Sequence, residues 1–79
     1  MQTLFVFVKA EPGRAYDVAD LAVDIETVSE VHSISGQHDL LLKCYLDDGA
    51  DIGLFVTQVI QTLPGVKDTF TLTAFKAFH

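Results

Sequence analysis

The chain has 79 residues, enough for one small domain whose own hydrophobic core gives only marginal stability. Eleven acidic residues against five basic ones give a formal net charge of −6, the wrong sign for direct binding to nucleic-acid phosphates. The single cysteine, Cys44, excludes an intrachain disulfide framework and favours a reducing compartment, and no apolar run is long enough to cross a bilayer. We therefore expect a soluble cytoplasmic protein without a leader segment.

The first half of the chain predicts a strand, a helix and a hairpin. Thr3–Lys9 is rich in β-branched and aromatic residues and ends at a Pro-Gly turn, which is typical of a strand. From Arg14 to about Ser29 the apolar residues recur at helical spacing, which predicts an amphipathic helix. Its expected core stripe consists of Ala15, Val18, Ala19, Ala22 and Ile25. Two further strands, Val31–Ser35 and Leu40–Leu46, are joined by a polar link with one glycine and predict a hairpin.

The second half predicts one helix and a final strand. The cleanest helical period follows an Asp-Asp-Gly turn, and its apolar stripe consists of Ile52, Phe55, Val56, Val59, Ile60 and Leu63. This helix stops at Pro64-Gly65, because proline lacks an amide donor and glycine suits a chain reversal. Val66–Phe78 is the last predicted strand. The order βαββαβ predicts a ferredoxin-like α+β fold, with both helices on one face of a four-stranded antiparallel sheet in the order 4-1-3-2.

The first predicted strand is apolar on both faces. Successive strand side chains alternate faces, so Leu4, Val6 and Val8 point one way and Phe5 and Phe7 the other. Two helices cover only one face, and we expect a second copy to cover the other in a face-to-face dimer, a dimeric α/β barrel. The helix-free face holds either Phe5, Phe7, Leu41, Lys43, Tyr45 and one alternating set of the last strand, or the complementary residues.

Two segments carry a resemblance to a known family. Val31–Lys43 contains a Ser-Gly-x-x-Asp hairpin, and Leu63–Thr69 contains a Leu-Pro-Gly-Val corner ahead of a threonine-rich strand. From Thr3 to Lys76 the chain resembles the effector domain of the Lrp/AsnC regulators, also called the RAM domain. Full-length members place a helix-turn-helix domain ahead of this module, whereas here the first strand follows Met1 at once. The resemblance therefore implies one stand-alone effector domain over residues 1–79, without a DNA-binding domain.

The resemblance also implies a function in transcription regulation, through binding of an amino acid or similar small effector. The site would lie between subunits, where the hairpin meets the last strand of a neighbour. Its candidate residues are Ser35, Gly36, Gln37, His38, Asp39, Leu72, Thr73 and Ala74. The implied partners are a homodimer, a higher oligomer such as an octamer or decamer, and full-length regulators of the family. An amino acid needs an anionic acceptor and several amide donors, which Asp39 and a glycine-containing loop could supply.

Other interpretations of these residues stay open. Asp39 could simply close the hairpin by accepting backbone amides, and Gly36 is needed for positive φ whatever the function. Cys44 is interpreted as a small buried hydrophobe without chemistry. The histidines lack metal-ligand spacing, and no motif indicates catalysis or a cofactor. The alternative functions are a small α/β-barrel enzyme of the monooxygenase type, with His38 or Tyr45 as the acid-base residue, and a pure assembly scaffold.

Overall fold

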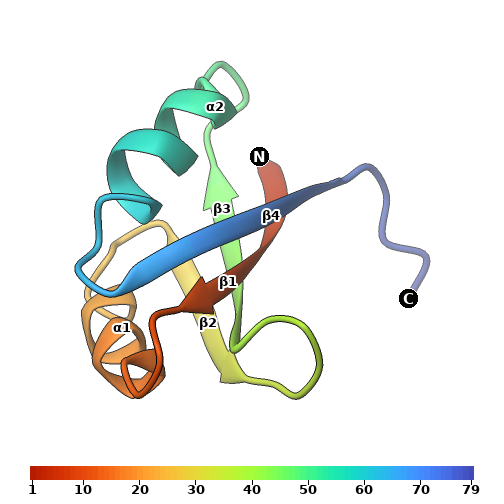
Figure 1. The fold of residues 1–79 in the computed structure, drawn as a ribbon. Helices are drawn as coiled ribbons and strands as arrows, with labels where there is room; N and C mark the ends of the chain where they lie inside the picture. The colour runs from red at the N-terminus through yellow and green to blue at the C-terminus, as the bar shows by residue number, and fades with distance from the viewer.

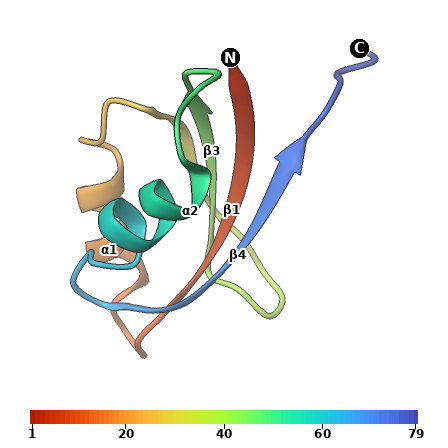
Figure 2. The same ribbon diagram turned by 90° about the horizontal axis from the view of Figure 1, so that it is seen from above.

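A computed structural model describes the whole chain, from Met1 to His79. The elements are β1 (Gln2–Ala10), α1 (Ala15–Ala22), β2 (Val28–Ser33), β3 (Leu40–Leu46), α2 (Ile52–Phe55) with a π-helical continuation (Val56–Ile60), and β4 (Val66–Ala74). The four strands form one antiparallel sheet in the order β2-β3-β1-β4 (Figure 1). Both helices lie on one side of that sheet, and Figure 2 shows the other side without a covering element. The predicted ferredoxin-like fold and strand order are confirmed.

The hydrophobic core lies between the sheet and the helices. Alternate residues of the two central strands face it, and Leu4, Val6 and Val8 of β1 are completely buried. The same holds in β3 for Leu40, Leu42 and Cys44. The predicted stripe of α1 meets these side chains, with Val18 and Ala22 fully buried and Ala15, Ala19 and Ile25 packed at the margin. The stripe is therefore confirmed, although Ile25 contributes from beyond the end of the helix.

The first helix is shorter than its apolar spacing predicts. It ends at Ala22 and not near Ser29, and the next strand begins at Val28, before its predicted start at Val31. Strand pairing excludes a helix that continues to Ser29, because Val28 already pairs with Cys44 on β3. A residue cannot take part in a sheet ladder and an α-helix at once, so tertiary pairing overrides the local periodicity here.

Both edge strands also end earlier than predicted. β2 ends at Ser33 and not at Ser35, where the chain turns into the hairpin loop. β4 ends at Ala74 and not at Phe78. Ala74 pairs with Thr3, close to the start of β1, so almost nothing of β1 is left to pair with the following residues. The length of a neighbouring strand therefore sets the end of β4.

The second helix widens in its last turn. Gln61 N–H donates to the Val56 carbonyl at 2.8 Å, which is the i to i+5 bond of a π-helical turn. A wider turn rotates the following side chains relative to the α-helical period. Val56 and Ile60 stay buried, but Val59, predicted on the core stripe, is 36% exposed. The remaining stripe residues pack against the core as predicted: Ile52, Phe55 and Leu63.

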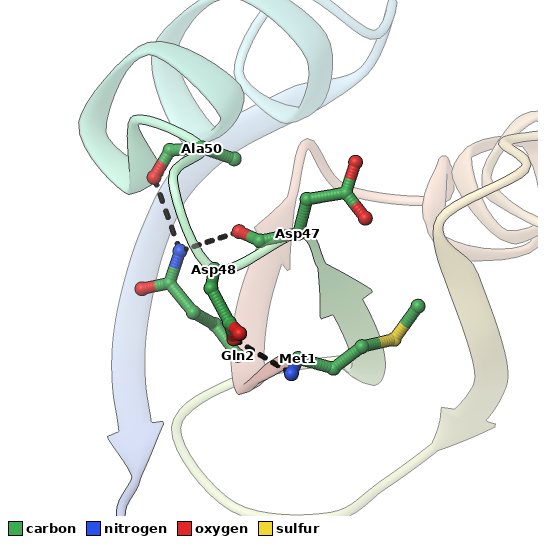
Figure 3. A network of polar contacts seen from close by, with 5 residues as sticks. All are labelled: Met1, Gln2, Asp47, Asp48 and Ala50. Atoms are coloured by element: carbon green, nitrogen blue, oxygen red, sulfur yellow. Dashed lines mark hydrogen bonds and ion pairs between the residues drawn. The ribbon is translucent and has the colours of Figure 1, made fainter.

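The start of β1 is tied to the turn between β3 and α2. Gln2 Nε2 donates to the carbonyls of Asp47 (2.8 Å) and Ala50 (3.1 Å), and the Met1 ammonium lies 2.6 Å from Asp48 Oδ1 (Figure 3). Carbonyls in such a turn have no ladder partner, and the side-chain amide satisfies two of them. These contacts fix the beginning of α2 relative to the sheet.

Candidate functional site

The uncovered face of the sheet is mainly apolar. The strand register places one set of side chains on it, namely Phe5, Phe7, Leu41, Lys43, Tyr45, Phe70 and Leu72. The sequence left open which of two alternating sets of side chains lies on the helix-free face. The structure places the set that contains Phe5 and Phe7 there. Phe70 is 54% exposed and Leu72 46% exposed. A single chain thus leaves aromatic and aliphatic area in contact with solvent.

A groove opens at the end of this face that lies next to the β2–β3 hairpin. Its volume is about 320 Å³, and it is lined by Phe7, Gln37, His38, Phe70 and Leu72. The His38 ring packs on both phenylalanines, with centroid distances of 5.6 Å to Phe7 and 6.4 Å to Phe70. Rings at this separation attract one another. The hairpin loop is therefore attached to the sheet through an aromatic cluster.

Asp39 is held in place by three hydrogen bonds. Its N–H donates to the Val8 carbonyl (2.9 Å), and its own carbonyl accepts from Ile34 N–H (3.0 Å). Its Oδ2 accepts from Ala10 N–H at 2.8 Å, which continues the β1–β3 ladder by one side-chain bond. Asp39 thus has the structural role that the sequence left open, because its side chain accepts a backbone amide at the hairpin. The other carboxylate oxygen, Oδ1, makes no hydrogen bond within the chain and can accept one from a ligand.

The tip of the hairpin consists of Ser35, Gly36 and Gln37, all exposed to solvent. Gly36 has φ of +102°, as the sequence predicts, and a Cβ at this position would meet no atom within 4 Å. The backbone amides of residues 35–38 donate no hydrogen bond within the chain. Neighbouring free N–H groups in a turn form a concave surface that binds anions such as a carboxylate.

The candidates on β4 are divided between the two faces of the sheet. Leu72 lies in the groove together with Gln37 and His38. Thr73 points to the helix-covered face, and Ala74 lies near the opposite end of the sheet beside a second groove. Within one chain the structure thus brings three of the eight candidates to one groove. A contact of Thr73 or Ala74 with the hairpin of another copy stays a prediction.

One polar cluster on the uncovered face was missed by sequence reasoning. Glu30 Oε1 lies 2.9 Å from His32 Nε2, and Glu30 Oε2 lies 3.6 Å from Lys43 Nζ, which in turn lies 5.4 Å from the Tyr45 ring centroid. The hydrogen bond from His32, with the charge of Lys43, holds the pKa of Glu30 below its usual value. The cluster depends on the pairing of Glu30 with Lys43, and no spacing in the sequence indicates that register.

The side chains with potential nucleophilic or acid-base chemistry lie either in the core or on the uncovered face of the sheet. Cys44 is completely buried, and burial raises the pKa of its thiol to about 11, so the thiol stays protonated at neutral pH. His38 and Tyr45, the acid-base candidates of the enzyme alternative, lie on the uncovered face. The space between the sheet and the helices is filled by the hydrophobic core.

Fold and hairpin together define a class of protein. The chain is a ferredoxin-like α+β domain whose glycine-containing hairpin loop carries unpaired amide donors next to a free carboxylate oxygen. The family follows from a direct match. The family model described as "Lrp/AsnC ligand binding domain" matches residues 3–79, and the chain therefore belongs to the Lrp/AsnC ligand-binding domain family.

The curated relatives are transcriptional regulators. HTH-type transcriptional regulator FL11 of Pyrococcus abyssi is 29% identical over 72 residues, which cover 91% of this chain and 47% of that protein. The uncharacterized HTH-type transcriptional regulator PH1916 of Pyrococcus horikoshii is 32% identical over 76 residues, which cover 92% of this chain and 51% of that protein. The chain thus spans about half the length of the curated relatives it matches.

Solved structures share the fold. TTHA0845 from Thermus thermophilus is 34% identical with a TM-score of 0.90, and the match covers 100% of this chain and 99% of that one. The L-Met complex of the transcriptional regulator NMB0573 from Neisseria meningitidis has 20% identity and a TM-score of 0.87, and the match covers 99% of this chain and 52% of that one.

None of the helices described here has the length and apolar character needed to span a membrane.

Proposed function

We propose that this domain binds an amino acid, or a closely related small effector, at the β2–β3 hairpin. The observation that carries the proposal is the free amide groups of residues 35–38 next to the unpartnered Oδ1 of Asp39. The effector's ammonium would bind Asp39 Oδ1 and its carboxylate would bind the loop amides, both through charge-assisted hydrogen bonds. Membership of the ligand-binding family supports this class of ligand, as does the L-Met complex of NMB0573.

The proposed site belongs to an oligomer. Two copies would pair their uncovered sheet faces about a two-fold axis, which gives a dimeric α/β barrel and removes Phe70 and Leu72 from water. Burial of apolar surface stabilises such a pair by about 25 cal/mol per Å². Association of dimers into a larger ring would bring Leu72, Thr73 and Ala74 of one copy to the hairpin of another. Binding of the effector would thereby depend on the state of assembly.

The domain would act on transcription through other proteins. The curated relatives that contain a matching segment are HTH-type regulators, and this chain spans about half the length of each. We propose that the chain co-assembles with such full-length regulators and passes the effector signal to them.

Thermal unfolding in the presence of each of the twenty amino acids tests effector binding. A ligand that binds only the folded protein, at a concentration of 100 Kd, adds about 2.7 kcal/mol to the free energy of unfolding. For a domain of this size we expect Tm to rise by roughly 10 °C or more. The rise should be confined to a few chemically related amino acids. A flat panel would contradict effector binding and favour the pure scaffold.

A pair of Asp39 variants tests the position of the effector ammonium. Asp39→Asn keeps an oxygen that can accept the Ala10 amide but removes the negative charge. We expect it to weaken binding of the amino acid found in the thermal panel by at least about tenfold, because a hydrogen bond to a charged group contributes about 1.5–3 kcal/mol. Isothermal titration calorimetry measures this loss.

Asp39→Ala is the matched comparison, because it removes the loop anchor as well. Its Tm without ligand should fall below that of the asparagine variant, since the Ala10 amide loses its acceptor. Wild-type affinity in Asp39→Asn would show that the ammonium binds elsewhere.

A further inference from the structure

We infer that residues 75–79 form an arm that docks on a second copy of this chain, with Phe75 entering the groove beside His38. The inference rests on the proposed pairing of sheet faces and adds a contact to it. The arm follows the last residue of β4, Ala74, and leaves the domain on the side that carries no helix (Figure 2). Its two aromatic residues, Phe75 and Phe78, are 98% and 88% exposed, more than any other aromatic side chain of the protein.

The groove has the chemistry that an aromatic side chain requires. Three of its five lining residues contribute rings, namely Phe7, His38 and Phe70, and the other two are Leu72 and Gln37. At about 320 Å³ the groove has the size of a small-ligand site. Aromatic rings pack edge to face or offset on one another, so a further ring entering from outside would complete the cluster.

A face-to-face pair whose two-fold axis crosses the strands near Leu72 would bring the arm of one copy to this groove of the other. When the two-fold axis runs across the strands, β4 of one copy lies antiparallel over β4 of the other. With the axis near Leu72, Ala74 lies over the partner's Phe70, because both residues are equally far from Leu72 along the strand. Packed sheets are about 10 Å apart. Phe75 is then the first residue free of the ladder, and its side chain can bridge that gap.

The exposed apolar side chains supply more than half of the area that a stable pair buries on each partner. Phe70, Leu72, Phe75 and Phe78 together expose on the order of 500 Å² in each chain, and the two residues of the arm account for most of it. A stable interface buries about 800 Å² on each partner. Without the arm, the exposed side chains of β4 cover only a small part of that area.

The charges of the face also permit a second copy to approach. The two acidic residues in the strands, Glu30 and Asp68, each lie beside a lysine: Glu30 contacts Lys43, and Asp68 pairs with Lys9. The remaining excess of acidic residues lies in the helices, loops and turns. A chain with a net charge of −6 therefore presents a nearly neutral face to its partner.

Photocrosslinking tests the contact directly. Phe75 is replaced by p-benzoylphenylalanine in unlabelled chains, which are mixed with ¹⁵N-labelled wild-type chains and illuminated. We expect mixed-isotope products that join position 75 to the partner's peptide containing Gln37 and His38 or to the one containing Phe70. Crosslinks within one chain only, or none, in a protein that sedimentation shows to be dimeric, would overturn the arm alone. A monomeric wild-type protein would overturn both the arm and the proposed pairing.

A double variant measures the energetic contribution of the arm. We expect Phe75→Ser with Phe78→Ser to raise the dimer dissociation constant by at least about tenfold, since two aromatic side chains lose a buried environment. Tyr16→Ser is the control, because Tyr16 is an aromatic residue of α1, 73% exposed, that lies away from the uncovered face. An unchanged dissociation constant in the double variant would overturn the docked arm while leaving the sheet pairing intact.

Discussion

We expect Phe70→Glu to convert the proposed face-to-face dimer into a folded monomer at micromolar concentration. Phe70 is 54% exposed in the single chain, so a carboxylate at this position stays hydrated and the fold tolerates it. In the paired state the same carboxylate would be buried without a partner, which costs about 3–5 kcal/mol. Because the two-fold axis repeats the change in both copies, the dimer dissociation constant should rise more than about a hundredfold.

Sedimentation equilibrium measures the change in mass, and far-UV circular dichroism confirms that the variant is folded. Tyr16→Glu is the matched control, because it adds the same charge at an exposed aromatic residue on the helix side of the sheet. We expect this control to keep the wild-type mass. A Phe70→Glu protein that dimerises as tightly as the wild type would show that the sheets do not pair through this face.

Gly65→Ala should lower the free energy of unfolding by roughly 2–4 kcal/mol, from two independent costs. Gly65 has φ of +94°, a conformation that costs an L-residue about 1–2 kcal/mol. A Cβ at this position would also lie 3.0 Å from Val18 Cγ2 and 3.2 Å from Arg14 Cβ. Val18 is completely buried, so it cannot move away without disturbing the core. The glycine of the Leu-Pro-Gly-Val corner is therefore required both by the positive φ of the backbone and by its close packing against α1.

Gly13→Ala separates the two costs. Gly13 also has positive φ, +77°, but a Cβ there would meet nothing within 4 Å. We expect this control to lose only about 1–2 kcal/mol, from the backbone conformation. Urea unfolding of both variants gives the comparison. Equal losses would contradict the close approach of Gly65 to α1.

The fold could be predicted from the sequence because its strands and helices have different apolar periods. Side-chain alternation gives the faces of β1, and the stripe of α1 identifies its core side. Besides the early end of β2 at Ser33, the errors occur at Val28, Val59 and Ala74. Strand pairing decides the first and the last of these, and a π-helical turn decides the second. Strand pairing depends on residues distant in the chain, and a π-helical turn depends on hydrogen-bond geometry. The local spacing of apolar residues carries no information about either.

The candidate site could be predicted only in outline. The conformation of Gly36 follows from its place in a hairpin, and it is confirmed. The bond from the Ala10 amide to Asp39 and the packing of His38 on Phe7 depend on how β1 meets the loop, which the sequence does not specify. The ligand-binding role of the eight candidate residues stays a prediction, because it concerns contacts with an effector and with other copies.

The central place of β1 in the sheet has a consequence for how the chain folds. The ribosome makes β1 before the other three strands, yet its pairing with β4 joins Thr3 to Ala74, which are 71 positions apart in the chain. Such non-local pairing makes folding slow compared with that of helical proteins of the same size. Until β4 emerges, one edge of the apolar strand Leu4–Val8 stays unpaired and can associate with other unfinished chains. Truncation within β4 should therefore lead to aggregation during synthesis.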